Sequence, residues 1–374
     1  MPLKVLQIAT SFPSWGGTEL HILNLSSELL KRGHEVTIAC RPGGWVESQA
    51  AERGIETFAC TLRKQHDWSQ LATLRRVMRD RRFDVLHVHW NSDILVPGYA
   101  GLVERVPVRI LSRHVPHRFR SRVGGFLFGR YLYSQVVSVS ESVRQVMIQS
   151  GVPPNRAITI HHGTDADQFR RLTKDRDSVR LELGLLPADV AINLPGRMTP
   201  EKGHGDVLAS LNLLRELDGV KVVFTGEGPL LDHLRQQAET LELGERVVFT
   251  GFRADIADVL NAMDVVVVPS TWEEPCSAVV QQGMVLSKPV VGTRVGGTPE
   301  MIVEGVTGIV VAPGDPVALA SALRSLVLDP AMRERMGREG RARVEQHFSL
   351  SGMTDRIERL YASGLTDSSD CGGR

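Results

Sequence analysis

The sequence lacks a long hydrophobic run, a closely spaced cysteine pair and any marked net charge. Its apolar runs, such as residues 265–269, are far shorter than the roughly 20 residues of a membrane-spanning helix. The four cysteines, at positions 40, 60, 276 and 371, include no C-x-x-C pair, which argues against a zinc site and a disulfide framework. The formal net charge of +1 indicates no particular partner, and we expect no nucleic acid to bind.

The start of the chain also lacks a targeting signal. Residues 1–10 contain one lysine, Lys4, and run directly into a strand-like stretch. They have no basic segment, long apolar stretch or cleavage site of a signal peptide, so we expect a cytoplasmic protein. With 374 residues, the chain is longer than one ordinary core and fits two domains.

Short apolar runs alternate with helical patterns in both halves of the chain. In the first half, the runs expected to form strands are residues 4–9, 35–40, 84–88, 108–111, 136–139 and 157–160. In the second half, they are residues 190–194, 221–225, 247–250, 265–268, 289–292 and 308–311. Continuous apolar strands separated by helices are typical of parallel sheets with helices on both faces. The sequence therefore predicts an α/β fold of two doubly wound domains, which bind ligands beyond the carboxyl ends of their strands.

The domain boundaries follow from polar stretches. Residues 165–179 are rich in Asp, Arg and Lys and are expected to join an N-terminal domain, residues 1–170, to a C-terminal domain, residues 178–348. A final helix over about residues 350–363 is expected to pack back on the N-terminal domain. Residues 364–374 are rich in Gly, Ser and Asp, so we expect a disordered tail.

Two loops that follow predicted strands suit phosphate binding. Gly16 and Gly17 lie between the first strand and the first helix, where glycine lets a ligand approach the backbone and the free N–H groups of the helix. Arg197 and Lys202 lie in a loop after a strand of the second half. An arginine fork with a lysine suits a diphosphate whose departure must be stabilised. Taken singly, the glycines also fit a purely steric turn, and the two cations fit an ordinary solvated loop.

A third segment follows the run of four valines at 265–268. Glu273 and Glu274 come first, and a helix is expected to begin near Ser277. Its free N–H groups form a natural anion site, and they belong to Cys276, Ser277 and Ala278. Glu274 can hydrogen-bond sugar hydroxyls, and Gln282 would lie on the ligand side of the helix. The alternative is that Glu273 and Glu274 only cap the helix.

Histidines provide the fourth candidate. His114 comes just after the strand-like run of residues 108–111 and is expected to point toward a cleft between the domains. A single histidine at a strand end is more often structural, so that alternative stays open. His161 and His162 suggest a metal site, but we expect no third ligand near them and therefore no metal.

Taken in order along the chain, a set of short motifs is more specific than any one of them. The set comprises Gly16-Gly17, Asp84-Val-Leu-His-Val-His89, His114, Val137-Ser-Val-Ser-Glu141, His162-Gly-Thr-Asp165, Gly196-Arg197 with Lys202-Gly203, Gly226-Glu-Gly-Pro229, Gly251-Phe252, Glu274, Lys288-Pro-Val-Val-Gly292 and Gly296-Gly-Thr-Pro-Glu300. This set resembles the retaining glycosyltransferases of family 4 (glycosyl transferases group 1), which have the glycosyltransferase B fold. The resemblance covers essentially the whole chain and implies two Rossmann-like domains facing a cleft.

The resemblance implies roles for the candidate residues. Arg197 and Lys202 would hold the donor diphosphate, and Glu274 would contact the transferred sugar. His114 would lie near the reacting sugar. The other positions expected to bind the donor or its nucleotide are Gly16, Gly17, Gly226, Glu227, Arg253, Cys276, Ser277, Ala278 and Gln282.

One position departs from the family pattern. The family has two glutamates with seven residues between them, and the second usually binds the nucleotide ribose. Counting from Glu274 leads to Gln282, which is not acidic. Glutamine can donate and accept hydrogen bonds but is not a strong bidentate acceptor. The departure concerns donor affinity or the choice of nucleotide more than the reaction itself.

Residues 117–133 combine four arginines with aromatic and aliphatic side chains. Basic residues beside exposed aromatics suit an anionic lipid surface, which would place the protein on the inner face of the cell membrane. A solvated helix whose aromatics belong to the core is the alternative.

The predicted reaction moves a sugar from a nucleotide-diphosphate-sugar, a UDP- or GDP-sugar above all, to a hydroxyl of a saccharide or lipid-linked acceptor. The expected setting is the synthesis of cell-surface polysaccharide, lipopolysaccharide or glycolipid. No cofactor is required, because Arg197 and Lys202 would take the place of a metal. The Asp165-Ala-Asp167 motif is expected to be structural. Two alternatives stay open: a nucleotide-sugar isomerase (epimerase) of the same fold, and a catalytically weakened protein that binds sugar nucleotides.

Overall fold

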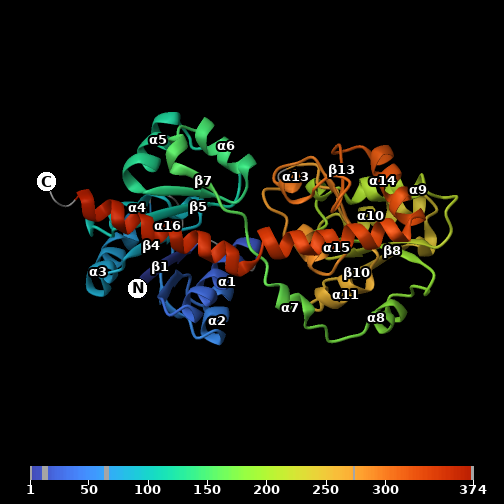
Figure 1. The fold of residues 1–374 in the computed structure, drawn as a ribbon, viewed down its shortest axis with the longest axis horizontal. Helices are drawn as coiled ribbons and strands as arrows, with labels where there is room; N and C mark the ends of the chain where they lie inside the picture. The colour runs from blue at the N-terminus through green and yellow to red at the C-terminus, as the bar shows by residue number, and fades with distance from the viewer. Residues whose placement is uncertain (1, 11–15, 63–66, 273, 372–374) are drawn as a thin grey trace. The chain divides into compact units, whose positions relative to one another are not determined.

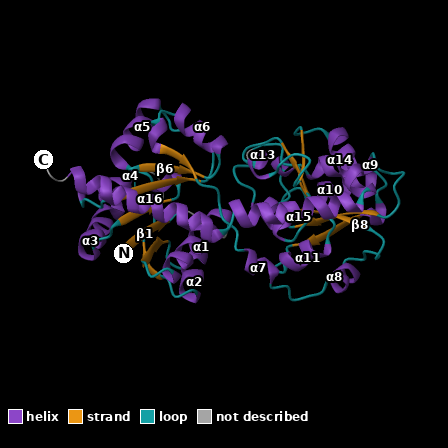
Figure 2. Cartoon of the chain, in the orientation of Figure 1, coloured by secondary structure: helices purple, strands orange, loops and turns teal. Residues whose placement is uncertain are grey.

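The chain forms two compact units in the computed structural model, which describes residues 2–10, 16–62, 67–272 and 274–371. One unit comprises Met1–Gly163 with Leu350–Arg374, and the other comprises Thr164–Ser349. Each unit has one parallel sheet with helices on both faces, as Figure 1 and Figure 2 show. The predicted α/β class with two doubly wound domains is confirmed.

The sheet of the first unit has the strand order β3-β2-β1-β4-β5-β6-β7. Its strands are β1 (Lys4–Ala9), β2 (Glu35–Cys40), β3 (Glu56–Ala59), β4 (Val85–Val88), β5 (Val108–Arg113), β6 (Gln135–Ser138) and β7 (Ala157–Thr159). The sequence did not predict β3, because this strand lies at the edge of the sheet and none of its four residues is fully buried. An edge strand lacks the continuous apolar run that marks a central one.

Two hydrophobic clusters cover the two faces of this sheet. One cluster combines side chains of α1 (Gly17–Lys31), α2 (Trp45–Glu52) and α16 (Leu350–Cys371) with Val5 and Ala9. The other combines α3 (Leu71–Arg81), α4 (Leu95–Val103) and α6 (Glu141–Gln149) with Leu6 and Ile8. The alternation along β1 follows from the two-residue period of a strand. Across the described residues, no helix has the length and apolar character needed to cross a bilayer.

The last helix is longer than expected. It continues to Cys371, whereas the predicted helix ended at about residue 363, so residues 364–371 are helical rather than a disordered tail. Leu360 and Leu365 pack against the core of the first unit. Gly364 lies so close to β5 that a Cβ there would be 3.0 Å from Val108 Cγ2. These contacts hold a segment whose polar composition alone indicated disorder.

The sheet of the second unit has the order β10-β9-β8-β11-β12-β13. Its strands are β8 (Val190–Pro195), β9 (Val220–Thr225), β10 (Val247–Gly251), β11 (Val265–Val268), β12 (Val290–Thr293) and β13 (Gly308–Val311). Its helices are α7 (Ala166–Arg170), α8 (Arg176–Glu182), α9 (His204–Asn212), α10 (Leu231–Thr240), α11 (Ile256–Ala262), α12 (Ala278–Val285), α13 (Thr298–Met301), α14 (Pro316–Leu328) and α15 (Pro330–His347). Because this unit begins at Thr164, α7 belongs to it rather than to the N-terminal range of 1–170.

Candidate functional site

A lysine and a glutamate from two different loops meet at the carboxyl end of the second sheet. Lys202 lies after β8, and its Nζ donates a hydrogen bond to Oε2 of Glu274, after β11, at 2.7 Å. The hydroxyl of Ser270 donates to the same oxygen at 2.6 Å. The structure thus brings together two of the predicted residues and adds Ser270. Its position two residues after the four-valine strand was the sequence signal that could have identified it.

The carboxylate of Glu274 does not cap α12. The residue is buried, with 7% of its surface exposed, and Oε2 is taken by Lys202 and Ser270. Among the residues that the structure describes, none donates a hydrogen bond to Oε1. For Glu274 the capping alternative is therefore wrong, whereas Glu273, like Trp15, lies outside the described residues.

Two glycines fix the backbone of Glu274. Its carbonyl oxygen accepts a hydrogen bond from the N–H of Gly297 at 2.9 Å. Gly296 has φ +54°, and a Cβ there would lie 2.2 Å from that oxygen. Only glycine permits both this conformation and this close approach. The loop after β12 thus holds the loop after β11 in place.

Arg197 is the exposed cation of the site. It follows Gly196, whose N–H donates to the carbonyl of Thr225 at 2.9 Å. Within residues 16–62, 67–272 and 274–371, its guanidinium has no carboxylate partner. Unlike Lys202, it is therefore available to an anionic ligand without breaking an ion pair.

Backbone contacts tie together the loops after β8, β9 and β10. The N–H of Gly226 donates to the carbonyl of Gly251 at 2.9 Å, and the N–H of Met198 donates to the carbonyl of Glu227 at the same distance. Gly226 has φ +141°, and a Cβ there would lie 2.1 Å from the carbonyl oxygen of Gly196. The predicted positions Gly226 and Glu227 therefore support the loop that carries Arg197.

The start of α12 agrees with the prediction. Ser277 is its N-cap and Ala278 its first residue, and the Ser277 side chain makes no capping hydrogen bond. Cys276 is partly buried just before them. Gln282 is also partly buried, and no described residue bonds its amide, whereas the neighbouring Gln281 is buried and bonded by Thr164 Oγ1.

Arg253, in the loop after β10, is bound by carboxylates of its own unit. Its guanidinium donates to both carboxylate oxygens of Asp255, at 2.7 and 2.6 Å, and to Glu182 at 2.5 Å. These bonds hold the pKa of Asp255 well below its usual range. Arg253 therefore joins the loop after β10 to α8, and a contact with the donor would have to compete with two carboxylates.

In the first unit, polar side chains gather on one face of the sheet at the carboxyl ends of its central strands. By strand alternation they share the face that α1 and α16 cover, and they are Gln7, His87, His89, Ser112 and His114. Nε2 of His89 lies 2.7 Å from Gln7 Oε1, and its Nδ1 lies 3.1 Å from Nε2 of His114. His114 is thus held from behind by a buried chain of hydrogen bonds.

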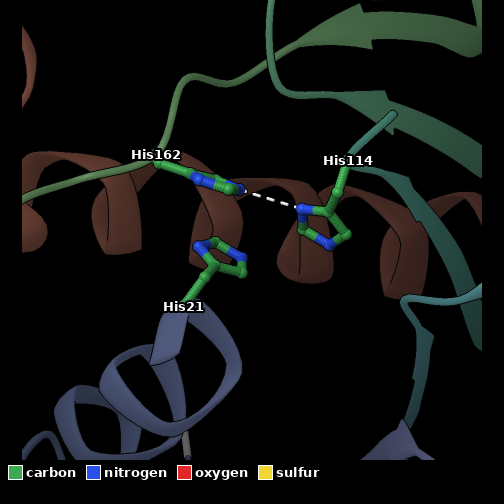
Figure 3. A group of neighbouring side chains, drawn as sticks. All are labelled: His21, His114 and His162. Atoms are coloured by element: carbon green, nitrogen blue, oxygen red, sulfur yellow. Dashed lines mark hydrogen bonds between the residues drawn. The ribbon is translucent and has the colours of Figure 1, made fainter. Parts of the chain in front are cut away.

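Three histidines from separate segments, His21, His114 and His162, meet where this series of hydrogen bonds ends (Figure 3). Nδ1 of His114 lies 2.9 Å from Nε2 of His162, and His21 of α1 stacks on His162 with ring centroids 4.3 Å apart. One ligand nitrogen of each ring lies within 4.8 Å of the other two. The expectation that His162 has no third ligand near it is therefore wrong. His21 and His114 are far from His162 in the sequence, so no local pattern indicated that the three lie together.

The rings nevertheless do not converge on one ion as they lie. An ion bound to imidazole sits in the plane of the ring, along the nitrogen lone pair. The planes of His21 and His162 are stacked at 21°, so one ion cannot lie in both without a ring rotation. Burial lowers the pKa of His162 to about 4, and burial together with the charges of His162 and His87 lowers that of His114 well below its usual value. These imidazoles are neutral at neutral pH, and each offers one donor and one acceptor.

The glycine turn after β1 leads into α1. Gly16 is the N-cap of this helix and Gly17 its first residue. A Cβ on Gly16 would lie 2.8 Å from a carboxylate oxygen of Glu19, which is 4% exposed. Burial raises the pKa of Glu19. This buried carboxyl is a further polar group that the sequence did not single out.

Two Rossmann-like units, one with cations and a glutamate at the carboxyl ends of its strands, match the arrangement of the two-domain glycosyltransferases. Residues 15–168 match the model of Glycosyltransferase Family 4, and residues 187–343 match that of Glycosyl transferases group 1. D-inositol 3-phosphate glycosyltransferase of Mycobacterium marinum is 30% identical over 399 residues, covering 94% of this chain and 82% of that protein. The chain therefore belongs to the family 4, group 1 glycosyltransferases and is an enzyme of that class.

Another relative agrees with this assignment, and solved structures agree with the fold. N-acetyl-alpha-D-glucosaminyl L-malate synthase of Bacillus anthracis is 24% identical, covering 96% of this chain and 97% of that protein. The Anabaena protein HepE in complex with UDP has a TM-score of 0.85 at 22% identity, covering 96% of this chain and 100% of that one. A glycosyltransferase of Rickettsia africae reaches a TM-score of 0.88 at 19% identity, covering 97% and 99%. At these identities, the two structures speak for the fold alone.

Proposed function

We propose that this enzyme transfers a sugar from a nucleotide-diphosphate-sugar to an acceptor hydroxyl and retains the anomeric configuration. The observation that carries the proposal is the ion pair of Lys202 with Glu274, together with the exposed Arg197 in the same loop as Lys202. A pyrophosphate needs cations as it departs, and a sugar needs acceptors for its hydroxyls. The second unit is accordingly the donor domain, and the first unit is the acceptor domain.

The proposed step is a substitution on one face of the sugar. The bond from the anomeric carbon to the diphosphate oxygen breaks, and the bond to the acceptor oxygen forms on the same face. The proton of the acceptor hydroxyl goes to the departing diphosphate. Arg197 and Lys202 stabilise the charge that develops there, so the reaction requires no metal or other cofactor.

The remaining residues bind and orient the donor. Glu274 turns its Oε1 to a hydroxyl of the transferred sugar, while Lys202 and Ser270 hold Oε2. The backbone N–H groups at the start of α12 face the nucleotide, and Gln282 bonds the ribose. In the first unit, His114 bonds the reacting sugar, and Gly16 and Gly17 lie by the phosphate and the acceptor.

Solved structures and relatives bear on the nucleotide base and on the acceptor. HepE, which shares the fold, was solved with UDP, with UDP and glucose, and with UDP-glucose. This favours a UDP-sugar over a GDP-sugar. A Rhizobium meliloti relative at 25% identity is a lipopolysaccharide core biosynthesis glycosyltransferase, which supports a role in cell-surface polysaccharide, lipopolysaccharide or glycolipid synthesis.

The test is the turnover of Arg197→Ala and Lys202→Ala with a donor found by thermal shift among UDP-, GDP- and ADP-sugars. Each variant should lose about 10²–10³-fold in kcat, the effect of removing a group that stabilises charge in the transition state. Arg335→Ala, on an exposed stretch of α15, is the matched control and should keep its turnover. Wild-type rates in both site variants would overturn the proposal.

Incubation without an acceptor separates the alternatives. An isomerase of the same fold would release free nucleotide or epimerised sugar without an acceptor. A weakened binding protein would shift in the thermal assay and turn over nothing with any acceptor. A retaining transferase gives a glycoside whose anomeric configuration matches that of the donor, which NMR of the product reads directly.

A further inference from the structure

An amphipathic segment of the first unit turns its apolar side chains to solvent. It consists of α5 (Arg122–Leu127) and a π-helical turn over Phe128–Leu132. The exposed side chains are Val123 at 68%, Phe126 at 46%, Leu127 at 46% and Tyr131 at 55%. Their spacing places them on one helical face. A surface helix normally buries its apolar face. This segment is inverted, because its apolar face is exposed and its glycines face the core.

Glycines explain the inversion. Gly125 and Gly129 are buried on the inner side of the segment. A Cβ on Gly125 would lie 2.0 Å from the carbonyl oxygen of Ser150, and one on Gly129 would lie 3.0 Å from Val152 Cγ1. The backbone therefore packs so closely that no larger side chain fits inward. The alternative from the sequence, that the aromatics here belong to the core, holds for Phe119 and Phe128 but not for Phe126 or Tyr131.

Positive charge surrounds the apolar face. The exposed arginines of this stretch are Arg118, Arg120, Arg122 and Arg130. The sequence contains no Asp or Glu between Glu104 and Glu141. Within the described ranges none of these arginines has a carboxylate partner; Arg118 reaches only Gln149, at 3.4 Å, and Arg130 lies over the ring of Tyr131. The surface is thus apolar at its centre and cationic around it.

We propose that this surface, residues 117–131, docks on an anionic lipid bilayer. Apolar side chains of an interfacial helix enter the boundary between headgroups and acyl chains, while arginines bind the lipid phosphates. A second copy of the chain fits less well, because a two-fold contact would set the same arginines against each other. The proposal concerns a partner of the first unit and is independent of the sugar transfer proposed above.

The test is flotation of the full-length protein with vesicles of phosphatidylcholine alone or mixed with phosphatidylglycerol. We expect at least about tenfold stronger binding to the anionic vesicles at low salt, weakened when salt shortens the screening length. The double variant Phe126→Ser with Leu127→Ser should lose binding by about tenfold or more. Its matched control, Leu181→Ser with Leu186→Ser, removes exposed leucines of the second unit and should bind like the wild type.

A second pair of variants tests the charges. Arg118→Glu with Arg122→Glu should abolish the preference for anionic vesicles, whereas Arg335→Glu with Arg338→Glu, the same charge change on α15, should preserve it. Thermal unfolding and turnover with a soluble acceptor should stay at wild-type values in the Phe126 and Arg118 double variants. A loss of vesicle binding is thereby distinguished from a loss of folding or of transferase activity.

Three outcomes would overturn the proposal. The wild-type protein could stay with the soluble fraction at low salt, or the Phe126 double variant could float as well as the wild type. Light scattering could instead show a concentration-dependent dimer that the same double variant breaks. In that last case a second copy of the chain covers the surface.

Discussion

The ion pair of Lys202 and Glu274 contributes to the stability of the fold as well as to the site. Glu274 is buried, and Lys202 supplies the positive charge that compensates it, with 32% of its own side chain exposed. Removing the lysine leaves an uncompensated carboxylate, which is the costly way to break such a pair. Lys202→Met should therefore lower the free energy of unfolding by about 1–3 kcal/mol, less than for a fully buried pair.

A double variant separates this structural effect from catalysis. Glu274→Gln in the Lys202→Met background makes the buried group neutral, so urea unfolding should show part of the stability regained. Turnover should stay lost, because both the cation and the carboxylate are then absent. Equal stability of the single and double variants would show that the pair is not energetically coupled.

Gln282 is the residue at which the family pattern described above leads us to expect a glutamate. Its amide has no bond to another described residue, so Gln282→Glu can act on a ligand without breaking a protein contact. We expect donor KM to change by about ten- to a hundredfold, the effect of one hydrogen bond to a charged group, with unfolding within about 0.5 kcal/mol of wild type. An unchanged KM would remove this position from the donor site.

The neighbouring glutamine provides the contrast. Gln281 is 1% exposed and bonded by Thr164 Oγ1. Gln281→Glu puts a charge in this buried place, so it should cost about 2 kcal/mol or more in urea unfolding. A larger loss in Gln282→Glu than in Gln281→Glu would contradict the burial of the two side chains.

The sequence predicted some site residues better than others, and the reason is sequence distance. Arg197, Lys202 and Glu274 lie in strand-end loops, and parallel strands bring such loops to one edge. The contact of His21 with His162 joins α1 to the segment after β7, which no local pattern encodes. The turn of Phe126 to solvent depends equally on the fit of Gly125 against Ser150, a contact between distant segments.

At the level of elements, burial decided which strands could be predicted. The central strands, such as β8 and β11, are buried on both faces and therefore appear as apolar runs. The edge strand β3 does not. Helix α15 was not predicted either, since few of its residues are buried and eight of its 18 residues are charged. For α16, packing against the first sheet outweighed a polar composition that indicates disorder.

The glycine contact between the loops after β8 and β9 gives a prediction for these elements. Gly226→Ala adds a Cβ 2.1 Å from the Gly196 carbonyl at a φ of +141°, so both loops must shift. We expect a loss of about 2–4 kcal/mol in unfolding free energy and a marked fall in donor affinity. Gly244→Ala, at φ +51° with open space around it, should cost only about 1 kcal/mol and leave donor binding intact. Equal effects of the two changes would contradict the close approach.

On the scale of the whole molecule, the first unit is built from both ends of the chain and the second from its middle. The first unit is completed by the last helix, whose Leu350, Met353, Ile357 and Tyr361 belong to its core. The second unit is continuous, from Thr164 to Ser349. The buried polar face of the first unit therefore depends on the end of the chain, because Tyr361 bonds His87 Nδ1 at 2.7 Å.

The burial of His87 makes the first unit sensitive to acid. Burial lowers the pKa of His87 to about 3, against about 6.5 in the unfolded chain, so the unfolded state binds more protons as pH falls between these values. The neutral His87 costs no stability above about pH 6.5. Between about pH 6.5 and 3, it lowers the free energy of unfolding by about 1.4 kcal/mol for each unit by which the pH falls. His87→Gln should reduce this slope in urea unfolding between about pH 7.5 and 5. His233→Gln, at an exposed position of α10, should not change it, and an equal slope in wild type and His87→Gln would show that His87 is not held neutral by the fold.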